Sequence, residues 1–80
     1  MSAPEPRIIA WSDHARAKAQ FLDIPFADIE DAILESHENR TRNTGVADWL
    51  LLFDRLAIAY NHPADGDDLI ALVVTLWRRS

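Results

Sequence analysis

Two short groups of ionisable side chains in the sequence could carry chemistry. His14 and Lys18 are four residues apart, so on a helix they would share one face, where the imidazole could accept a proton and the ammonium could hold a negative charge. Arg78 and Arg79 follow an apolar run and could grip a phosphate at the end of a strand. A structural hydrogen bond is the commoner role for a histidine near a helix cap, as solvation is for a terminal arginine pair.

The sequence predicts neither a metal nor a cofactor. Its three histidines, His14, His37 and His62, fall in separate segments and show no metal-binding spacing. Residues 65–68, Asp-Gly-Asp-Asp, faintly resemble a calcium loop but lack its ligand spacing and final Glu, so we predict a hairpin turn there. The chain has no cysteine, which excludes a disulfide framework, a thiolate zinc site and a cysteine nucleophile.

The segment that must position these groups is the apolar run from Leu69 to Trp77. Its β-branched content and the turn-forming residues before it predict a strand. Ile70, Leu72, Val74 and Leu76 would point to one side and the residues between them to the other, and both sides are mostly apolar. We therefore expect a central strand covered on one face by helices and on the other by a partner subunit.

The first half of the chain predicts one short strand and two helices. Residues 7–11 are apolar and predict an edge strand. Ser12 or Asp13 can cap a helix that runs to about Leu22. Pro25 interrupts that helix and suits the first position of a second one, which ends near His37. So short a connection predicts a helical hairpin packed across one face of the sheet.

The region 46–61 allows two interpretations. Its apolar residues could form one face of a helix, but alternation along 56–61 has the period of a strand. We therefore predict two strands, 49–53 and 56–61, joined by a tight turn at Asp54 and Arg55, with a hairpin through 62–68 to the last strand. Residues 39–45 are polar and could be a loop or a frayed strand.

Composition bounds the class of protein. The 80 residues fit one α+β domain, residues 7–80, behind a disordered tail, residues 1–6. So small a core has a thin stability margin, which favours a homodimer or a small protein partner. The N-terminus has no apolar signal region and no apolar run could span a bilayer, so we expect a cytoplasmic protein. A net charge of −5 disfavours RNA as a partner.

The order strand, two helices and antiparallel meander resembles the RelE and ParE toxin superfamily, and in particular a small domain family close to its BrnT branch. Short, degenerate motifs carry the resemblance from about Ile8 onward. They are His14-Ala15 with Lys18, Ile24, Asp28-Ile29, and Val73-Val74-Thr75 followed by Arg78. The chain departs from the family pattern at Leu22, Asp23 and Pro25, where many members have a basic residue, a glycine and a polar helix cap.

The resemblance implies a metal-independent ribonuclease-type toxin of a toxin-antitoxin pair, or a diverged relative without activity. Such toxins use basic and aromatic side chains on a sheet face to grip RNA and to assist attack of a 2′-hydroxyl on the next phosphate. Under that hypothesis the site residues are His14, Lys18, Arg78 and Arg79. The alternative is a non-catalytic dimeric module that binds proteins through its apolar strands.

Overall fold

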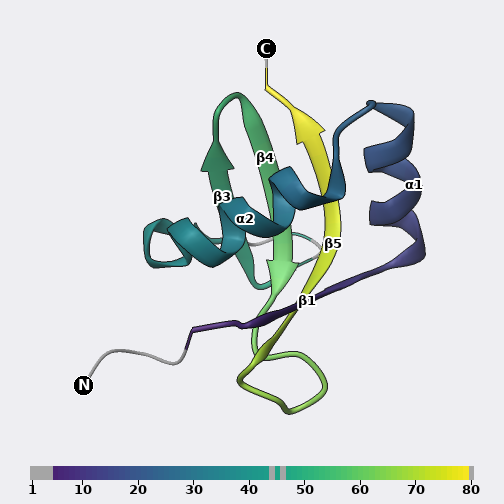
Figure 1. Cartoon of the computed structure of the whole chain (residues 1–80). Helices are drawn as coiled ribbons and strands as arrows, with labels where there is room; N and C mark the ends of the chain where they lie inside the picture. Colours follow the sequence, from purple (N-terminus) through teal and green to yellow (C-terminus); the bar gives the residue numbers. More distant parts are fainter. Residues whose placement is uncertain (1–4, 44, 46, 80) are drawn as a thin grey trace.

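The computed structural model describes residues 5–43, 45 and 47–79, and in these it has two α-helices and one five-stranded sheet. In chain order the elements are β1 (Ile8–Trp11), α1 (Asp13–Phe21), α2 (Phe26–Ser36), the 3-10 helix η1 (His37–Asn39), β2 (Thr41–Arg42), β3 (Trp49–Phe53), β4 (Leu56–Asn61) and β5 (Ile70–Arg78). The strands lie in the order β1-β5-β4-β3-β2 (Figure 1). The predicted α+β layout is confirmed.

A two-residue turn joins β3 and β4. Asp54 and Arg55 both have positive φ, 47° and 68°, the conformation of a type I′ hairpin, whose twist matches that of the flanking strands. The pairing places Leu51 opposite Ile58. Residues 49–53 and 56–61 are therefore two strands, as predicted, and the alternative helix is wrong.

The segment 39–45, for which the sequence allowed a loop or a frayed strand, contains a short edge strand at residues 41–42. Thr44, like Val46, lies outside the described residues.

The C-terminal strand β5 is an interior strand of the sheet. It pairs in parallel with β1 and antiparallel with β4. The middle strand is β4, not β5 as we expected, because β3 and β2 add two strands beyond β4 and only β1 adds one beyond β5.

A bulge in β5 changes which of its side chains are buried. Ala59 pairs with Thr75 and Tyr60 with Val73, so Val74 is an extra residue without a partner in β4. The alternation shifts there, and Leu76 is buried on the same side as Val73. The predicted grouping of Val74 and Leu76 with Ile70 and Leu72 is therefore wrong after Val73.

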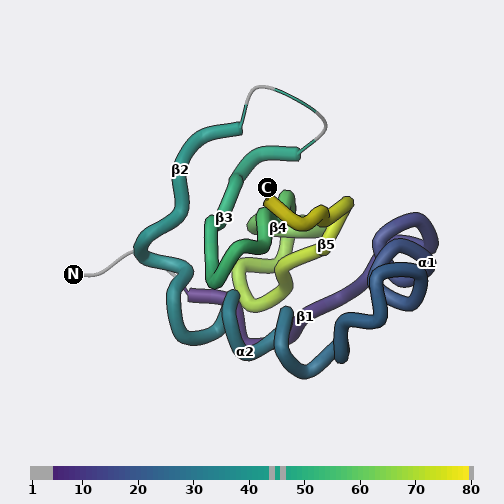
Figure 2. Tube along the Cα trace, turned by 90° about the horizontal axis from the view of Figure 1, so that it is seen from above, coloured from purple at the N-terminus to yellow at the C-terminus, as the bar shows by residue number. Residues whose placement is uncertain are grey.

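The two helices cover different parts of the sheet. Helix α2 crosses one face, whereas α1 runs along the edge of β5 (Figures 1 and 2). β1 pairs only with the first residues of β5, as far as Val73, so the rest of that edge is free to receive α1. The fully buried Ala15 and Ala19 allow α1 to lie close against it. The predicted hairpin exists, but only its second helix lies across the face.

The cap at Ser12 fixes where α1 begins. Its side-chain oxygen accepts a hydrogen bond from the Ala15 N–H at 3.0 Å, and its hydroxyl donates to the Val74 carbonyl at 3.0 Å. One side chain therefore ends β1, starts α1 and ties the helix to β5 at the bulge.

The core lies between α2, α1 and the covered face of the sheet. Its buried members are Ala15, Ala19, Ile24, Ile29, Ala32, Ile33, Leu51, Ile58, Tyr60, Ala71, Val73 and Leu76. At its edge Trp11 from β1 packs on Phe26 from α2, with ring centroids 4.6 Å apart. Small residues on α1 and large ones on α2 explain why α2 forms the layer and α1 the border.

Residues 1–4 of the predicted tail lie outside the described residues, and Pro6 is buried. Within the described residues, no helix combines the length and apolar character that a membrane crossing requires.

Candidate functional site

His14 lies in the first turn of α1 and faces β5. Its Nε2 atom is 3.1 Å from the Thr75 hydroxyl oxygen, at an exposed position. Lys18 follows one turn later and is half-buried. The helix therefore holds this pair beside β5, and the imidazole has a hydrogen-bond partner there.

Arg78 lies near the other end of α1. Its Nη2 donates to the Leu22 carbonyl at 2.8 Å, which ties the end of β5 to the end of the helix. Arg79 is exposed, and its backbone N–H donates to the Arg55 carbonyl at 2.7 Å. Both arginines therefore form hydrogen bonds that fasten the end of β5, Arg78 through its side chain and Arg79 through its backbone.

The four predicted site residues do not converge. Thr75 and Arg78 are three residues apart on a regular stretch of β5, so their side chains point to opposite faces. Leu76 is in the core, which places Arg78 on the α2 side and Thr75 on the other. His14 and Arg78 therefore border different faces of the sheet.

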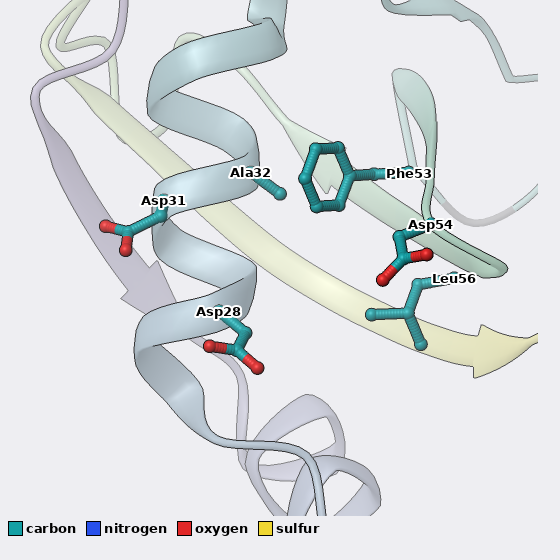
Figure 3. A pocket seen from close by; sticks show the side chains of 6 residues that line it. All are labelled: Asp28, Asp31, Ala32, Phe53, Asp54 and Leu56. Carbon is teal, nitrogen blue, oxygen red and sulfur yellow. The ribbon is translucent and has the colours of Figure 1, made fainter.

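Carboxylates surround Arg78. It lines a pocket of about 250 Å³ with Asp23, Asp28 and Asp54. A neighbouring hollow of about 270 Å³ between α2 and the β3–β4 turn shares Asp28 and Asp54, and Asp31 also lines it, with its carboxylate on the side of α2 away from the turn (Figure 3). One cation beside the three carboxylates of Asp23, Asp28 and Asp54 leaves a negative field, which repels a phosphate.

A second group of polar side chains is buried at the opposite end of α2. The Nδ1 atom of His37 and the hydroxyl oxygen of Tyr60 are 2.7 Å apart, and both side chains are buried. The His62 ring meets the His37 ring edge-on at a centroid distance of 4.7 Å, and its Nε2 donates to the Asp68 carbonyl at 2.6 Å. Two segments far apart in the sequence, η1 and the end of β4 with His62 after it, therefore meet in one buried cluster.

Burial decides the charge of this cluster. Burial, together with smaller effects of the nearby Arg40 and His62, lowers the pKa of His37 to about 4. Burial also raises the pKa of Tyr60 to about 12, against an opposing effect of Arg40. Both groups are therefore neutral at pH 7. No set of three or more His, Asp or Glu among the described residues could hold a metal ion.

Next to this cluster, two arginines stack on one tryptophan. The Cζ atom of Arg40 lies 4.1 Å from the centroid of the Trp49 ring, and that of Arg42 lies 5.0 Å from it. Arg40 also donates from Nη1 to the His37 carbonyl at 3.1 Å, and Trp49 donates from Nε1 to the His62 carbonyl at 3.1 Å. The indole therefore holds both guanidinium groups against the end of the sheet.

The sheet face opposite α2 has no helix over it in the part of the chain that the structure describes (Figure 2). The strand register assigns to this face Ile8, Ala10, Thr41, Leu50, Leu52, Ala57, Ala59, Asn61, Ile70, Leu72, Thr75 and Trp77. None of these residues carries a charge. Leu52 is 50 % exposed and Trp77 40 % exposed, whereas both alanines of β4 on this face, Ala57 and Ala59, are buried.

Sequence reasoning did not find the buried cluster. The sequence analysis considered His37 and His62 as metal ligands and predicted no contact of either with Tyr60. No spacing connects η1 with β4, because their contact depends on where α2 lies on the sheet. The exposure of Trp77 could have been predicted from the sequence. Both sides of its strand are apolar, and a single core covers only one of them.

Comparisons of this chain with protein-family models, with curated proteins and with solved structures found no match.

Proposed function

We propose that this protein is a non-catalytic interaction module that forms a homodimer through the sheet face opposite α2. The observation that carries the proposal is the chemistry of that face: it is mostly apolar, bears no charged strand residue and leaves Leu52 and Trp77 about half exposed. Apolar surface left in water favours association because its burial is favourable by about 25 cal/mol per Å².

A second copy fits this face better than a charged partner does. The chain has 13 acidic and 8 basic residues, so two copies repel each other over most of their surfaces. On this face they would meet without contact between like charges. Sheets pack face to face with apolar side chains interdigitated, and the half-exposed Leu52 and Trp77 are the side chains of this face that are available for such packing.

Catalysis on RNA has less support. Cleavage would need a proton acceptor and fixed positive charge around one phosphate. His14 and Arg78 border opposite faces, and Arg78 lies among Asp23, Asp28 and Asp54. The net charge of −5 adds a general repulsion toward a polyanion.

Light scattering on the purified chain tests the proposal. We expect the wild type to have the mass of a dimer and Leu52→Glu to weaken the dimer by at least about 100-fold, because each copy would bury a carboxylate in the interface. Leu34→Glu is the matched control. Leu34 is a leucine of similar exposure, 43 %, but it lies on α2.

Three results would count against the proposal: a wild type that stays monomeric at several hundred micromolar, a Leu52→Glu variant that remains a dimer, and dissociation by both variants alike. Circular dichroism of each variant establishes that the monomer is folded.

A further inference from the structure

Arg40 and Arg42 form an unusual pair of cations. They are two residues apart at the start of the edge strand, so their side chains point to the same side, and Arg42 pairs directly with Trp49. Both Cζ atoms lie within 5.0 Å of the same indole centroid. Two positive charges held on one aromatic ring repel each other, and stacking on the ring offsets part of that cost.

Neither guanidinium is neutralised within the described residues. No carboxylate among them forms an ion pair with Arg40 or Arg42, although acidic residues outnumber basic ones in the chain. The Nε atom of Arg40 is buried and has no hydrogen-bond partner there. Buried donors nearly always have a partner in folded proteins, and an anion is the kind of group that would suit this donor and the two positive charges next to it.

We propose that Arg40 and Arg42, held by Trp49, form a binding site for the phosphate group of a small molecule. A guanidinium that lies over an aromatic ring presents its N–H groups at its edge, and their planar fork matches the oxygens of a phosphate. Arg40 already donates from Nη1 to the His37 carbonyl, so Arg42 has the larger share of unused donors. Two such forks match the charge of a phosphate dianion.

His37 contributes a neutral donor beside the site. The Tyr60 hydroxyl stays protonated, and its only hydrogen-bond partner in the described residues is the His37 Nδ1, so it donates there. The imidazole proton is then on Nε2, which is buried and unpartnered like the Arg40 Nε. Arg40 is linked to the same residue through the His37 carbonyl.

Nuclear magnetic resonance of the ¹⁵N-labelled full chain tests the site with inorganic phosphate as the probe. The Nε–H signals of arginine and the Nε1–H signals of tryptophan report on the proposed contacts directly. We expect phosphate to shift the signals of Arg40, Arg42 and Trp49 with a dissociation constant in the millimolar range. Sodium chloride at the same ionic strength should leave them in place.

Arg42→Gln is the informative variant because Arg42 is exposed, so we expect its loss to leave the fold intact. It should weaken phosphate binding by about tenfold. The matched control is Arg55→Gln, an exposed arginine at the β3–β4 turn, which should leave binding unchanged. Acetate and sulfate titrations separate a site for phosphate from one for any oxyanion.

The site would be refuted by shifts spread evenly over all arginines, by equal responses to chloride, or by unchanged affinity in Arg42→Gln. The measurement is the same for a monomer and a dimer, so its result is independent of the proposed dimerisation.

Discussion

The His37 Nδ1 and the Tyr60 hydroxyl oxygen lie 2.7 Å apart in the interior of the protein. The two residues come from η1 and β4, so this bond joins the end of the helical segment to the middle strand of the sheet. Because both groups are neutral and buried, the bond satisfies two polar atoms that would otherwise be costly to remove from water.

Removal of the Tyr60 hydroxyl should therefore destabilise the fold. We expect Tyr60→Phe to lower the free energy of unfolding by about 1–2 kcal/mol, since the ring still fills its space but His37 Nδ1 loses its donor. Urea denaturation measures the change. Thr41→Val is the control, because it removes an exposed 3.3 Å bond to the Leu50 carbonyl and should have an effect below about 0.5 kcal/mol. Equal effects of the two substitutions would contradict a buried bond.

The same histidine should make the protein sensitive to acid. Its pKa is about 4 in the folded state and 6.5 in the unfolded chain, so between these values the unfolded chain binds more protons and stability falls as the pH falls. The contribution of neutral His37 to the free energy of unfolding is fully present above pH 6.5. As the pH falls to about 4, the free energy of unfolding decreases by an amount on the order of 2 kcal/mol.

Urea midpoints measured from pH 7.5 to pH 4 in wild type and His37→Gln check this. The carboxylates titrate in the lower part of the same range, but they do so in both proteins, so the difference between the two urea midpoints reports on the histidine. This difference in midpoint should become smaller as the pH falls. A difference that is constant with pH would contradict the prediction.

Parts of this fold could be predicted because they depend on local pattern. Alternation from Leu56 to Asn61, the turn at Asp54 and the cap at Ser12 each act within a few residues, and all three are as expected. The bulge at Val74 could not be predicted. In a run that is apolar on both sides, one inserted residue does not change the pattern of apolar and polar residues. The His37 and His62 contact was also beyond reach, because it requires the docking of α2 and the hairpin after β4 at once.

The dispersal of the predicted site leads to an expectation about activity. The purified chain should leave labelled RNA intact, because no phosphate could touch both His14 and Arg78 on opposite faces of the sheet. Gel analysis after incubation with and without a chelator measures this. Cleavage that is lost in both His14→Ala and Arg78→Ala but kept in Arg16→Ala, an exposed arginine of α1, would restore the ribonuclease hypothesis.

The β3–β4 turn offers a way to stabilise the protein. Asp54 and Arg55 both occupy the left-handed region, which costs about 1–2 kcal/mol for most residues with a side chain and little for Gly or Asn. The double substitution Asp54→Asn with Arg55→Gly should raise the free energy of unfolding by about 1 kcal/mol, after allowance for the greater freedom of glycine in the unfolded chain. Only the backbone carbonyl of Arg55 bonds to Arg79, so that contact remains.

Arg16→Gly in α1 is the control for this turn variant, because glycine inside a helix should lower stability by about 1 kcal/mol. Urea denaturation of the two variants should therefore give changes of opposite sign. A loss of stability in the turn variant would mean that the Asp54 and Arg55 side chains make contacts worth more than the strain of their backbone.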